Sequence, residues 1–524
     1  MMKYFSQEER FKTLISPPKD ISKLLQDDMW LISGDFYGIQ KFIFDGLSTK
    51  NASKVLRAKS AFIQIFTEYI AKYICFKLNV KEDAIVSINA GKFEILVPEK
   101  EIDLDAVQKK LDDYFIQNFY GLSGIMLSSV ACKRDDFTEI QHYKALRKKI
   151  IDSIEEKKFQ KFNLFEENAF DVLTYDTNIN NQTLCSICNI RKVQEGKENC
   201  SICNSFVKLG QKLSFEHQEE LVDSDTLGID FDKDFIIDIN LNKKVKSYIL
   251  FDGHSPADFK TLADSSCKNS ETGIKSLAVL KADVDNMGKF LEKSNVTNCF
   301  ENFDSFSKTM DNFFSLYIPK LMKMEYPNTY TVFAGGDDLF LLGAWDEVLE
   351  MAREIEHEFK AFVKSEELSI SFGIAIAKPS TPISYLAEYT EHLLEEAKEI
   401  DEKKDAISLF RETVKWKRYK AVYGELYGTL EAFEEHLNTA FLYRLLELIE
   451  MSKKVKYHDD IPSTIWKSKF RYSFNRNVLE KMRGDKEKER AENILRLLSR
   501  LIDENPKETK MVVNEFIYTR RSVT

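Results

Sequence analysis

The stretch TVFAGGDDLFLL, residues 331–342, contains the first group of side chains suited to metal chemistry. Two apolar runs flank its central Gly-Gly-Asp-Asp, which predicts a β-hairpin with two carboxylates, Asp337 and Asp338, at its tip. Gly335 and Gly336 at the turn would let a triphosphate come close to the backbone. Carboxylates at the ends of buried strands are costly unless they bind a cation such as Mg²⁺. Taken alone, the motif fits a metal site and an ordinary surface hairpin equally well.

A second pair of carboxylates, Asp283 and Asp285, ends the apolar run in SLAVLKADVDNM, residues 276–287. Because side chains alternate along a strand, both carboxylates are expected on the same face. A strand ending in Asp-x-Asp beside a hairpin tipped with Asp-Asp is what a two-metal nucleotidyl transferase requires. One ion would activate a hydroxyl, and the other would bind the leaving pyrophosphate. Together the two pairs favour an Mg²⁺ (or Mn²⁺) site over a surface hairpin.

Four of the eight cysteines are clustered in two C-x-x-C pairs, Cys185 with Cys188 and Cys200 with Cys203. This spacing is typical of a tetrahedral zinc site that closes a small loop. A pair of disulfides is the alternative, which a cytoplasmic location disfavours. Four thiolates leave no open coordination position, so the predicted Zn²⁺ is structural.

Composition limits the classes of function. The hydrophobic content is 43%, no apolar run is long enough to span a membrane, and the N-terminus has no signal-peptide pattern. We therefore expect a cytoplasmic protein without membrane contact. The formal net charge of −10 argues against a protein that wraps nucleic acid alone. From Trp416 onward, however, the helical sequence contains 22 Lys and Arg against 17 Asp and Glu. This region is either a bundle with solvated charge or a docking surface for RNA or a partner.

The chain around the two motifs repeats one pattern of elements. Two segments each predict the order β-α-β-β-α-β, followed by a further helix, which is the ferredoxin-like arrangement. Asp35 and Gly91 lie about as far apart in the first segment as Asp283 and Gly336 do in the second. We therefore expect an α+β fold that contains two ferredoxin-like domains.

The two copies differ in their chemistry. Superposition of the copies places Tyr37 on Asp285, and Lys92 and Phe93 on the two aspartates of the hairpin tip. A Lys and a Phe cannot ligate Mg²⁺. The first copy is thus predicted to have the fold without the metal site, with Asp35 as a structural carboxylate, and the second copy is the candidate catalyst.

These features resemble one known family. The strings GDFYGIQKFIF and LRAKSAFIQIF, the C-x-x-C pairs, LKADVDNMGKF and FAGGDDLFLL occur in the order seen in the large subunit of type III CRISPR effector complexes. The Gly-Ile-Gln-x-Phe-Ile string is more similar to the III-A (Csm) branch than to the III-B branch. The resemblance implies two cyclase-like palm domains, a zinc-bearing linker domain and a helical C-terminal domain. The corresponding boundaries are a lead-in at 1–28, a degenerate palm at 29–164, the zinc-binding linker at 165–270, the catalytic palm at 271–412 and the helical domain at 413–524.

The resemblance also implies an activity. Such subunits convert ATP to cyclic oligoadenylate second messengers when the complex, carrying a guide RNA, captures a matching target RNA. The implied partners are the other subunits of the type III-A complex, guide RNA and target RNA. Asp283, Asp337 and Asp338 would be the catalytic carboxylates, with Asp285 as a weaker Mg²⁺ ligand.

A nucleotide-binding set follows from the same resemblance. It would comprise backbone N–H groups for phosphates, a position near the adenine, the hairpin glycines and a lysine near the triphosphate. Its members are Asn286, Met287, Gly288, Ser307, Gly335, Gly336 and Lys398. For Lys398, an ordinary solvated helix lysine is the alternative.

Many members of this family begin with an HD-type nuclease domain. Fewer than thirty residues precede the first copy here, so we expect no DNase activity. The lone His458-Asp459 dipeptide is interpreted as a surface feature. Two rival functions are a silent scaffold of the RNA-guided complex and a stand-alone diguanylate cyclase. The intact second acid set argues against the first rival. The Leu339 after the acid pair, the zinc insert and the duplicated fold argue against the second.

Overall fold

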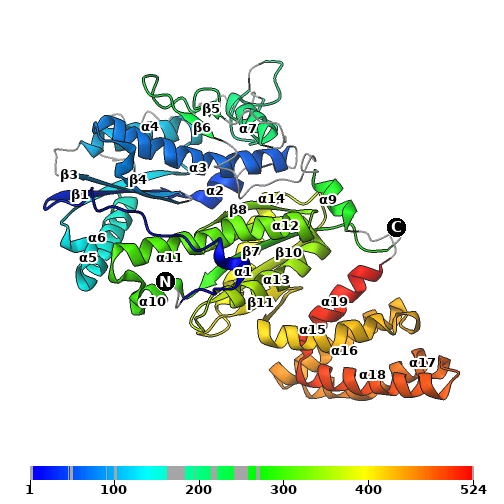
Figure 1. Ribbon diagram of the computed structural model, residues 1–524. Helices are drawn as coiled ribbons and strands as arrows, with labels where there is room; N and C mark the ends of the chain where they lie inside the picture. The colour runs from blue at the N-terminus through cyan, green and yellow to red at the C-terminus, as the bar shows by residue number, and fades with distance from the viewer. Residues whose placement is uncertain are drawn as a thin grey trace.

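The structure is a computed structural model that describes residues 4–44, 47, 51–89, 91–98, 103–161, 183–193, 195–213, 221–240, 258–266 and 272–521. Helices and strands alternate along the chain, and the predicted α+β class is confirmed. Figure 1 shows two sheets in neighbouring parts of the molecule, with the last helices gathered at the lower right.

The first sheet is antiparallel, with strand order β2-β3-β1-β4. Its strands are β1 (Met29–Tyr37), β2 (Ile85–Asn89), β3 (Lys92–Pro98) and β4 (Gly124–Cys132). Helices α3 (Ala52–Lys77) and α4 (Leu104–Phe119) pack on one face, where Ile32 and Phe93 are buried. Helix α6 (Ile140–Lys158) covers the opposite face, over Leu31 and Val130.

The second sheet has the strand order β12-β11-β10-β7-β9-β8. Its strands are β7 (Leu277–Asp285), β8 (Thr329–Gly335), β9 (Asp338–Ala344), β10 (Ser369–Ala377), β11 (Ala406–Leu409) and β12 (Glu412–Lys415). Only the β10–β11 pair among these is parallel. The first four strands in chain order, β7 to β10, have the same spatial order as β1 to β4 in the first sheet. This is the strand order of a ferredoxin-like unit.

Alternate residues of β7 enter two different cores, because successive side chains of a strand point to opposite faces. Leu277 and Val279 join the core that the second sheet shares with α3 and the first sheet. Ala278 and Leu280 join the core that contains helices from the other face and from the end of the chain. Those helices include α11 (Phe300–Asn312), a π-helical turn (Phe313–Tyr317), α12 (Ile318–Glu325) and α13 (Trp345–Phe362).

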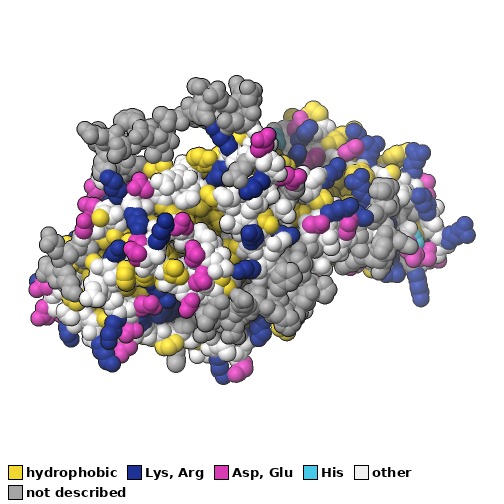
Figure 2. Space-filling view, turned by 90° about the horizontal axis from the view of Figure 1, so that it is seen from above, with side chains coloured by type: hydrophobic (Ala, Val, Ile, Leu, Met, Phe, Trp, Pro, Cys, Tyr) yellow, Lys and Arg dark blue, Asp and Glu magenta, His cyan; other side chains and the backbone are white. Residues whose placement is uncertain are grey.

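The last five helices continue this second core. They are α15 (Trp416–Glu431), α16 (Thr439–His458), α17 (Trp466–Asn477), α18 (Asp485–Glu504) and α19 (Pro506–Arg520). Buried Trp416 stacks edge-on against Phe372 of β10, with ring centroids 5.0 Å apart. The helices therefore pack directly on the second sheet. Over the described part of the face seen in Figure 2, cationic and anionic side chains are interspersed.

The remaining elements are short or lie at the edges. They are α1 (Glu9–Lys12), α2 (Ile39–Phe44), α5 (Asp135–Thr138), α7 (Ser201–Lys212), β5 (Leu221–Asp223), β6 (Asp238–Asn240), α9 (Phe259–Ser265) and α10 (Met287–Lys293). The N-terminal segment crosses both halves of the molecule: Ser6 N–H donates to the carbonyl of Phe362, and the Lys19 ammonium donates to the carbonyl of Asp83. None of the described helices combines the length and apolarity needed to cross a membrane.

Helix α14 (Ile383–Lys398) lies on the same face of the second sheet as the odd-numbered residues of β7. The helix packs closely against β10 because the strand has a glycine, Gly373, at the contact. A Cβ atom at Gly373 would lie only 2.5 Å from the carbonyl oxygen of Thr390. The glycine thus sets how near the helix, including Lys398 at its end, comes to the sheet.

We expect Gly373→Ala to lower the free energy of unfolding by about 1–3 kcal/mol, because the added methyl group would overpack against helix backbone. The matched control is Gly424→Ala in the exposed interior of α15, where nothing lies within 4 Å of the added atom. The free energy of unfolding of the control should rise by about 1 kcal/mol, because alanine favours the helix more than glycine does. Urea unfolding measures both changes. Equal stability of the two variants would contradict the close packing of α14 on β10.

Candidate functional site

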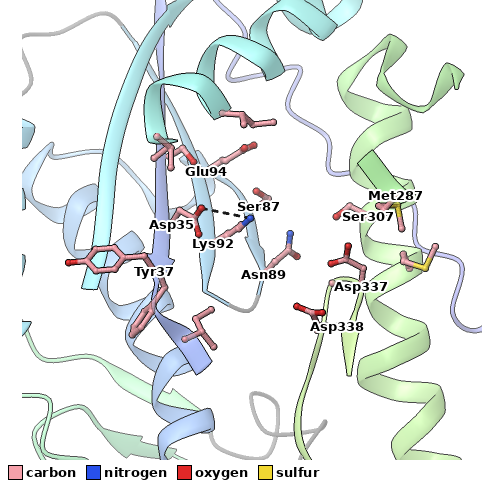
Figure 3. A pocket seen from close by; sticks show the side chains of 18 of the residues that line it. Asp35, Tyr37, Ser87, Asn89, Lys92, Glu94, Met287, Ser307, Asp337 and Asp338 are labelled. Carbon is pink, nitrogen blue, oxygen red and sulfur yellow. Dashed lines mark ion pairs between the residues drawn. The ribbon is translucent and has the colours of Figure 1, made fainter. Parts of the chain in front are cut away.

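A cavity of about 850 Å³ lies where the first sheet faces the second, and residues from both sheets line it. Figure 3 shows Asp35, Ser87, Asn89 and Lys92 on one wall. On the opposite wall, Met287, Ser307, Asp337 and Asp338 face them across the opening. The cavity therefore joins the two copies that the sequence predicts to be chemically different.

Asp283, Asp337 and Asp338 form a compact acid cluster, in which one carboxylate oxygen from each lies within 4.8 Å of the others. The strand register explains this convergence. Antiparallel pairing of β7 with β9 sets Asp283 directly opposite Asp338. The N–H of Val284 donates to the carbonyl of Asp337 at 3.2 Å, which ties the turn to the end of β7.

Burial and mutual repulsion make this cluster poor at holding three negative charges on its own. Burial, together with a hydrogen bond and charge repulsion from Asp283, raises the pKa of Asp338 to about 8. Burial and the Asp283 charge also raise the pKa of Asp337. A divalent cation between the oxygens would remove both penalties. The donor set, three carboxylates within reach of one ion, fits Mg²⁺ or Mn²⁺.

Two lysines adjoin the acid cluster. The Lys398 ammonium at the end of α14 forms an ion pair with Asp283 Oδ2. Burial acts to lower the pKa of Lys398, but the charge and hydrogen bond of Asp283, together with the other nearby carboxylates, raise the pKa overall. Lys281, two residues before Asp283 on β7, is buried and pairs with Glu391 of α14. Strand alternation places Lys281 on the same face as Asp283, a signal that the sequence analysis did not use.

The structure does not bring Asp285 into the acid cluster, so its prediction as an Mg²⁺ ligand needs correction. Its side chain is fully buried, and its Oδ2 accepts hydrogen bonds from the hydroxyls of Ser369 and Ser371 at 2.7 and 2.9 Å. The N–H of Asp405 donates to the same oxygen at 3.0 Å. These contacts connect β7, β10 and the segment before β11, which is a structural function.

The predicted nucleotide-binding residues divide into two groups. Met287, Ser307, Gly335 and Gly336 line the cavity. Outside its lining lie Asn286, Gly288 and Lys398. Asn286 has a left-handed backbone (φ 58°), and its amide donates to the carbonyl of Glu402 at 3.3 Å.

The wall contributed by the first sheet is neutralised internally. Asp35 Oδ2 pairs with Lys158 at 2.8 Å and with Lys92 at 3.8 Å. Beside them, the Arg147 guanidinium pairs with Glu94. Asp35 is therefore held by lysines from β3 and α6, whereas its counterpart Asp283 faces two further carboxylates.

The strand register corrects the superposition of the copies by one residue. Lys92 lies opposite Asp35 as Asp338 lies opposite Asp283. Lys92 is thus the counterpart of Asp338, and Phe93 is the counterpart of the following leucine. The earlier superposition matched the copies at Gly91 and Gly336, which occupy different positions of their turns. The conclusion that the first copy has no acid cluster is unaffected.

The four clustered cysteines converge on one point. Cys185, Cys188, Cys200 and Cys203 are all buried, and their sulfur atoms lie within 4.8 Å of one another. None of them forms a disulfide, so the structure does not adopt the disulfide alternative. Cys200 caps α7 by accepting the N–H of Cys203 at 3.4 Å. Four sulfur donors in a closed, buried group fit a tetrahedral structural Zn²⁺.

Two sheets of the same strand order, a shared cavity and an acid cluster on one sheet define a protein built from two ferredoxin-like units around one candidate site. Two family models match the chain: "Csm1 subunit domain B" over residues 28–175 and "Cas10/Cmr2, second palm domain" over residues 276–408. The chain is thus related to the Cas10/Csm1 subunits of type III-A CRISPR systems, which it resembles over most of its length.

Curated relatives are similar over most of this chain. One from Methanocaldococcus jannaschii is 25% identical over 84% of this chain and 66% of its own length. Another, from Streptococcus thermophilus, is 26% identical over 80% of this chain and 59% of its own length. Both are named CRISPR system single-strand-specific deoxyribonuclease Cas10/Csm1 (subtype III-A). The chain thus spans roughly three fifths to two thirds of the length of these relatives.

Solved structures share the fold at lower identity. The apo Csm1-Csm4 cassette matches with a TM-score of 0.65 at 19% identity, covering 98% of this chain and 70% of that chain. The same cassette in complex with one ATP matches with a TM-score of 0.66 at 19% identity, covering 95% and 71%.

We expect Mn²⁺ affinity to rise by about tenfold per pH unit below pH 8 and to level off above it, because Asp338 must release its proton to bind the ion. The affinity rises with pH because a carboxyl with a pKa near 8 is mostly protonated at pH 6 and mostly ionised at pH 9. Isothermal titration of the full chain with Mn²⁺ at pH 6, 7, 8 and 9 measures the change. Constant affinity from pH 6 to pH 8 would show that Asp338 is already ionised.

We expect Cys185→Ser with Cys188→Ser to remove bound zinc and to lower the melting temperature, because the remaining thiols cannot complete a tetrahedral site. Elemental analysis and thermal unfolding provide the two readouts. The matched control is Cys75→Ser, a buried cysteine outside the cluster, which should keep its zinc. Full zinc content in the double variant would contradict the assignment.

Proposed function

We propose that this chain is a type III-A effector subunit that converts ATP to cyclic oligoadenylates when its guide-RNA complex binds target RNA. The observation that carries the proposal is the acid cluster of Asp283, Asp337 and Asp338 beside a cavity between two palm-like sheets. Structures similar to this chain are described in complex with cA3, cA4 and pppApA. Those ligands belong to the neighbours, and they support the same chemistry here.

The proposed layout follows the expected boundaries. It comprises a lead-in at 1–28, a degenerate palm at 29–164, a zinc-binding linker at 165–270, a catalytic palm at 271–412 and a helical domain at 413–524. The two sheets and the packing of α15–α19 support this division. Csm1 occurs with Csm4 in the similar structures, so we infer a Csm4-type partner, together with guide and target RNA.

In the proposed mechanism, the acid cluster would hold Mg²⁺, which would make an attacking 3′-hydroxyl more acidic and offset the charge of the leaving pyrophosphate. The chain itself supplies position. Gly335 and Gly336 leave room for a triphosphate beside the acid pair, and Ser307, on the same wall, would contact the base. Lys398, which lies outside the cavity lining and pairs with Asp283, would take a phosphate oxygen as a new partner.

The first sheet would hold the acceptor nucleotide. Ser87, Asn89 and Lys92 present hydroxyl, amide and ammonium groups to the cavity, across from Asp337 and Asp338. A nucleotide on this wall would aim its 3′-hydroxyl at the α-phosphate of one held by the second sheet. No protein nucleophile is needed for this reaction. Positioning of the two nucleotides would therefore supply most of the rate acceleration.

The names of the curated relatives include a single-strand-specific deoxyribonuclease activity. We propose no such activity for the described residues. His458 and Asp459, the one His-Asp dipeptide of the sequence, are exposed at the end of α16 and lie outside the cavity.

We expect Asp337→Ala with Asp338→Ala to abolish oligoadenylate synthesis and to leave the fold intact, because only the cation-binding groups are removed. The measurement incubates labelled ATP and Mg²⁺ with the chain assembled in its guide-RNA complex, with and without matching target RNA. The matched control is Asp459→Ala with Asp460→Ala, two adjacent acids outside the cavity.

Product from the Asp337/Asp338 variant would overturn the assignment of the site. Product from GTP in place of ATP would support a diguanylate-type cyclase instead. Absence of product from the native chain, with guide and target RNA still bound, would support the scaffold function.

A further inference from the structure

A carboxylate outside the cavity contacts the turn that holds the acid pair. Asp311, near the end of α11, accepts the backbone N–H of Gly336 through its Oδ1 at 2.9 Å. Asp311 does not line the cavity and does not belong to the acid cluster. Its link to the site is therefore indirect, through the turn between β8 and β9.

This hydrogen bond holds Gly336, the first of two neighbouring turn residues whose backbone is fixed by other elements. Gly336 has a left-handed backbone (φ 68°), and its N–H is held by α11 through Asp311. The next residue, Asp337, is held by β7, because its carbonyl accepts the N–H of Val284 at 3.2 Å. Two different elements thus hold the backbone at the two consecutive residues directly before Asp338. A small change in either would move the carboxylates away from Asp283.

The setting of Asp311 favours a positioning function over simple packing. Its second oxygen accepts a hydrogen bond from the Ser315 hydroxyl at 3.3 Å. In the part of the chain that the structure describes, no lysine, arginine or histidine forms an ion pair with it. Burial raises its pKa, and the N–H of Gly336 acts in the opposite direction. A partly buried carboxylate without a cationic partner is costly, and the hydrogen bonds from Gly336 and Ser315 offset that cost.

The helix is locally modified next to this residue. α11 ends at Asn312 and continues into the π-helical turn Phe313–Tyr317. The wider turn lets Phe313 and Phe314 both enter the core, where each is fully buried, while Asp311 faces the hairpin. π-helical turns are rare and are frequently found at functional sites.

We propose that Asp311 is a positioning residue that sets the β8–β9 turn so that Asp337 and Asp338 converge on Asp283. Its activity readout rests on the proposed function, whereas cation binding tests it independently. The distinguishing feature is the hydrogen-bond acceptor itself: an asparagine oxygen can replace it, and an alanine cannot.

The test compares Asp311→Ala, Asp311→Asn and the native full chain by titration with Mn²⁺ and by ATP turnover. Asp311→Ala should weaken Mn²⁺ binding by about tenfold or more, in the range seen when groups that orient metal ligands are removed. It should lower kcat by a similar factor with little change in KM for ATP, because Asp311 does not line the cavity. Asp311→Asn should retain most of the affinity and turnover.

The control is Glu356→Ala, a buried carboxylate of α13 that pairs with Lys420 at 2.5 Å outside the cavity. It should lose stability but keep native Mn²⁺ affinity. Where Asp311→Ala does not fold, Asp311→Ser makes the same comparison, since its hydroxyl is too short to reach Gly336.

Native Mn²⁺ affinity in Asp311→Ala, or equal loss in Asp311→Asn, would overturn the inference. Equal loss in the Glu356 control would also overturn it, by showing a general effect of destabilisation. If the native chain binds Mn²⁺ but makes no product, the proposed function fails. In that case, weaker binding in Asp311→Ala still supports the positioning function.

Discussion

Three carboxylates held within reach of one another are the constraint around which the second palm-like sheet is arranged. Pairing of β7 with β9 brings Asp283 opposite Asp338, and burial raises the pKa of Asp338 to about 8. Such a cluster opposes folding unless positive charge compensates for it. Lys398 supplies part of that charge in the structure, and a divalent cation would supply the rest.

The same register in the first sheet leads to a different result. There Lys92 lies opposite Asp35, and Lys158, which also pairs with Glu155, completes a neutral group. One backbone arrangement thus supports a charged acid cluster in one copy and a self-neutralised wall in the other. Because the two walls face one cavity, their difference gives the site two chemically unlike halves.

The acid cluster depends on residues that do not line the cavity. Gly373 lets α14 approach β10, and α14 in turn carries Lys398 to Asp283. On the other side, α11 holds the turn through Asp311. Asp285 belongs to this supporting set as well, since it binds two serine hydroxyls of β10 and the N–H of Asp405. The site is therefore positioned from both faces of the sheet.

Local patterns in the sequence were sufficient to predict the α+β class, the hairpin with Asp337 and Asp338 at its tip, and the cysteine cluster. These features depend on strand alternation, turn glycines and ligand spacing, which act over a few residues. The structure alone decided which carboxylates meet. Asp283 and Asp285 share a face by alternation, yet only Asp283 reaches the hairpin, because register and packing against β10 separate them. The contact of Asp311 with Gly336 likewise had no sequence signal, since it joins residues brought together only by tertiary packing.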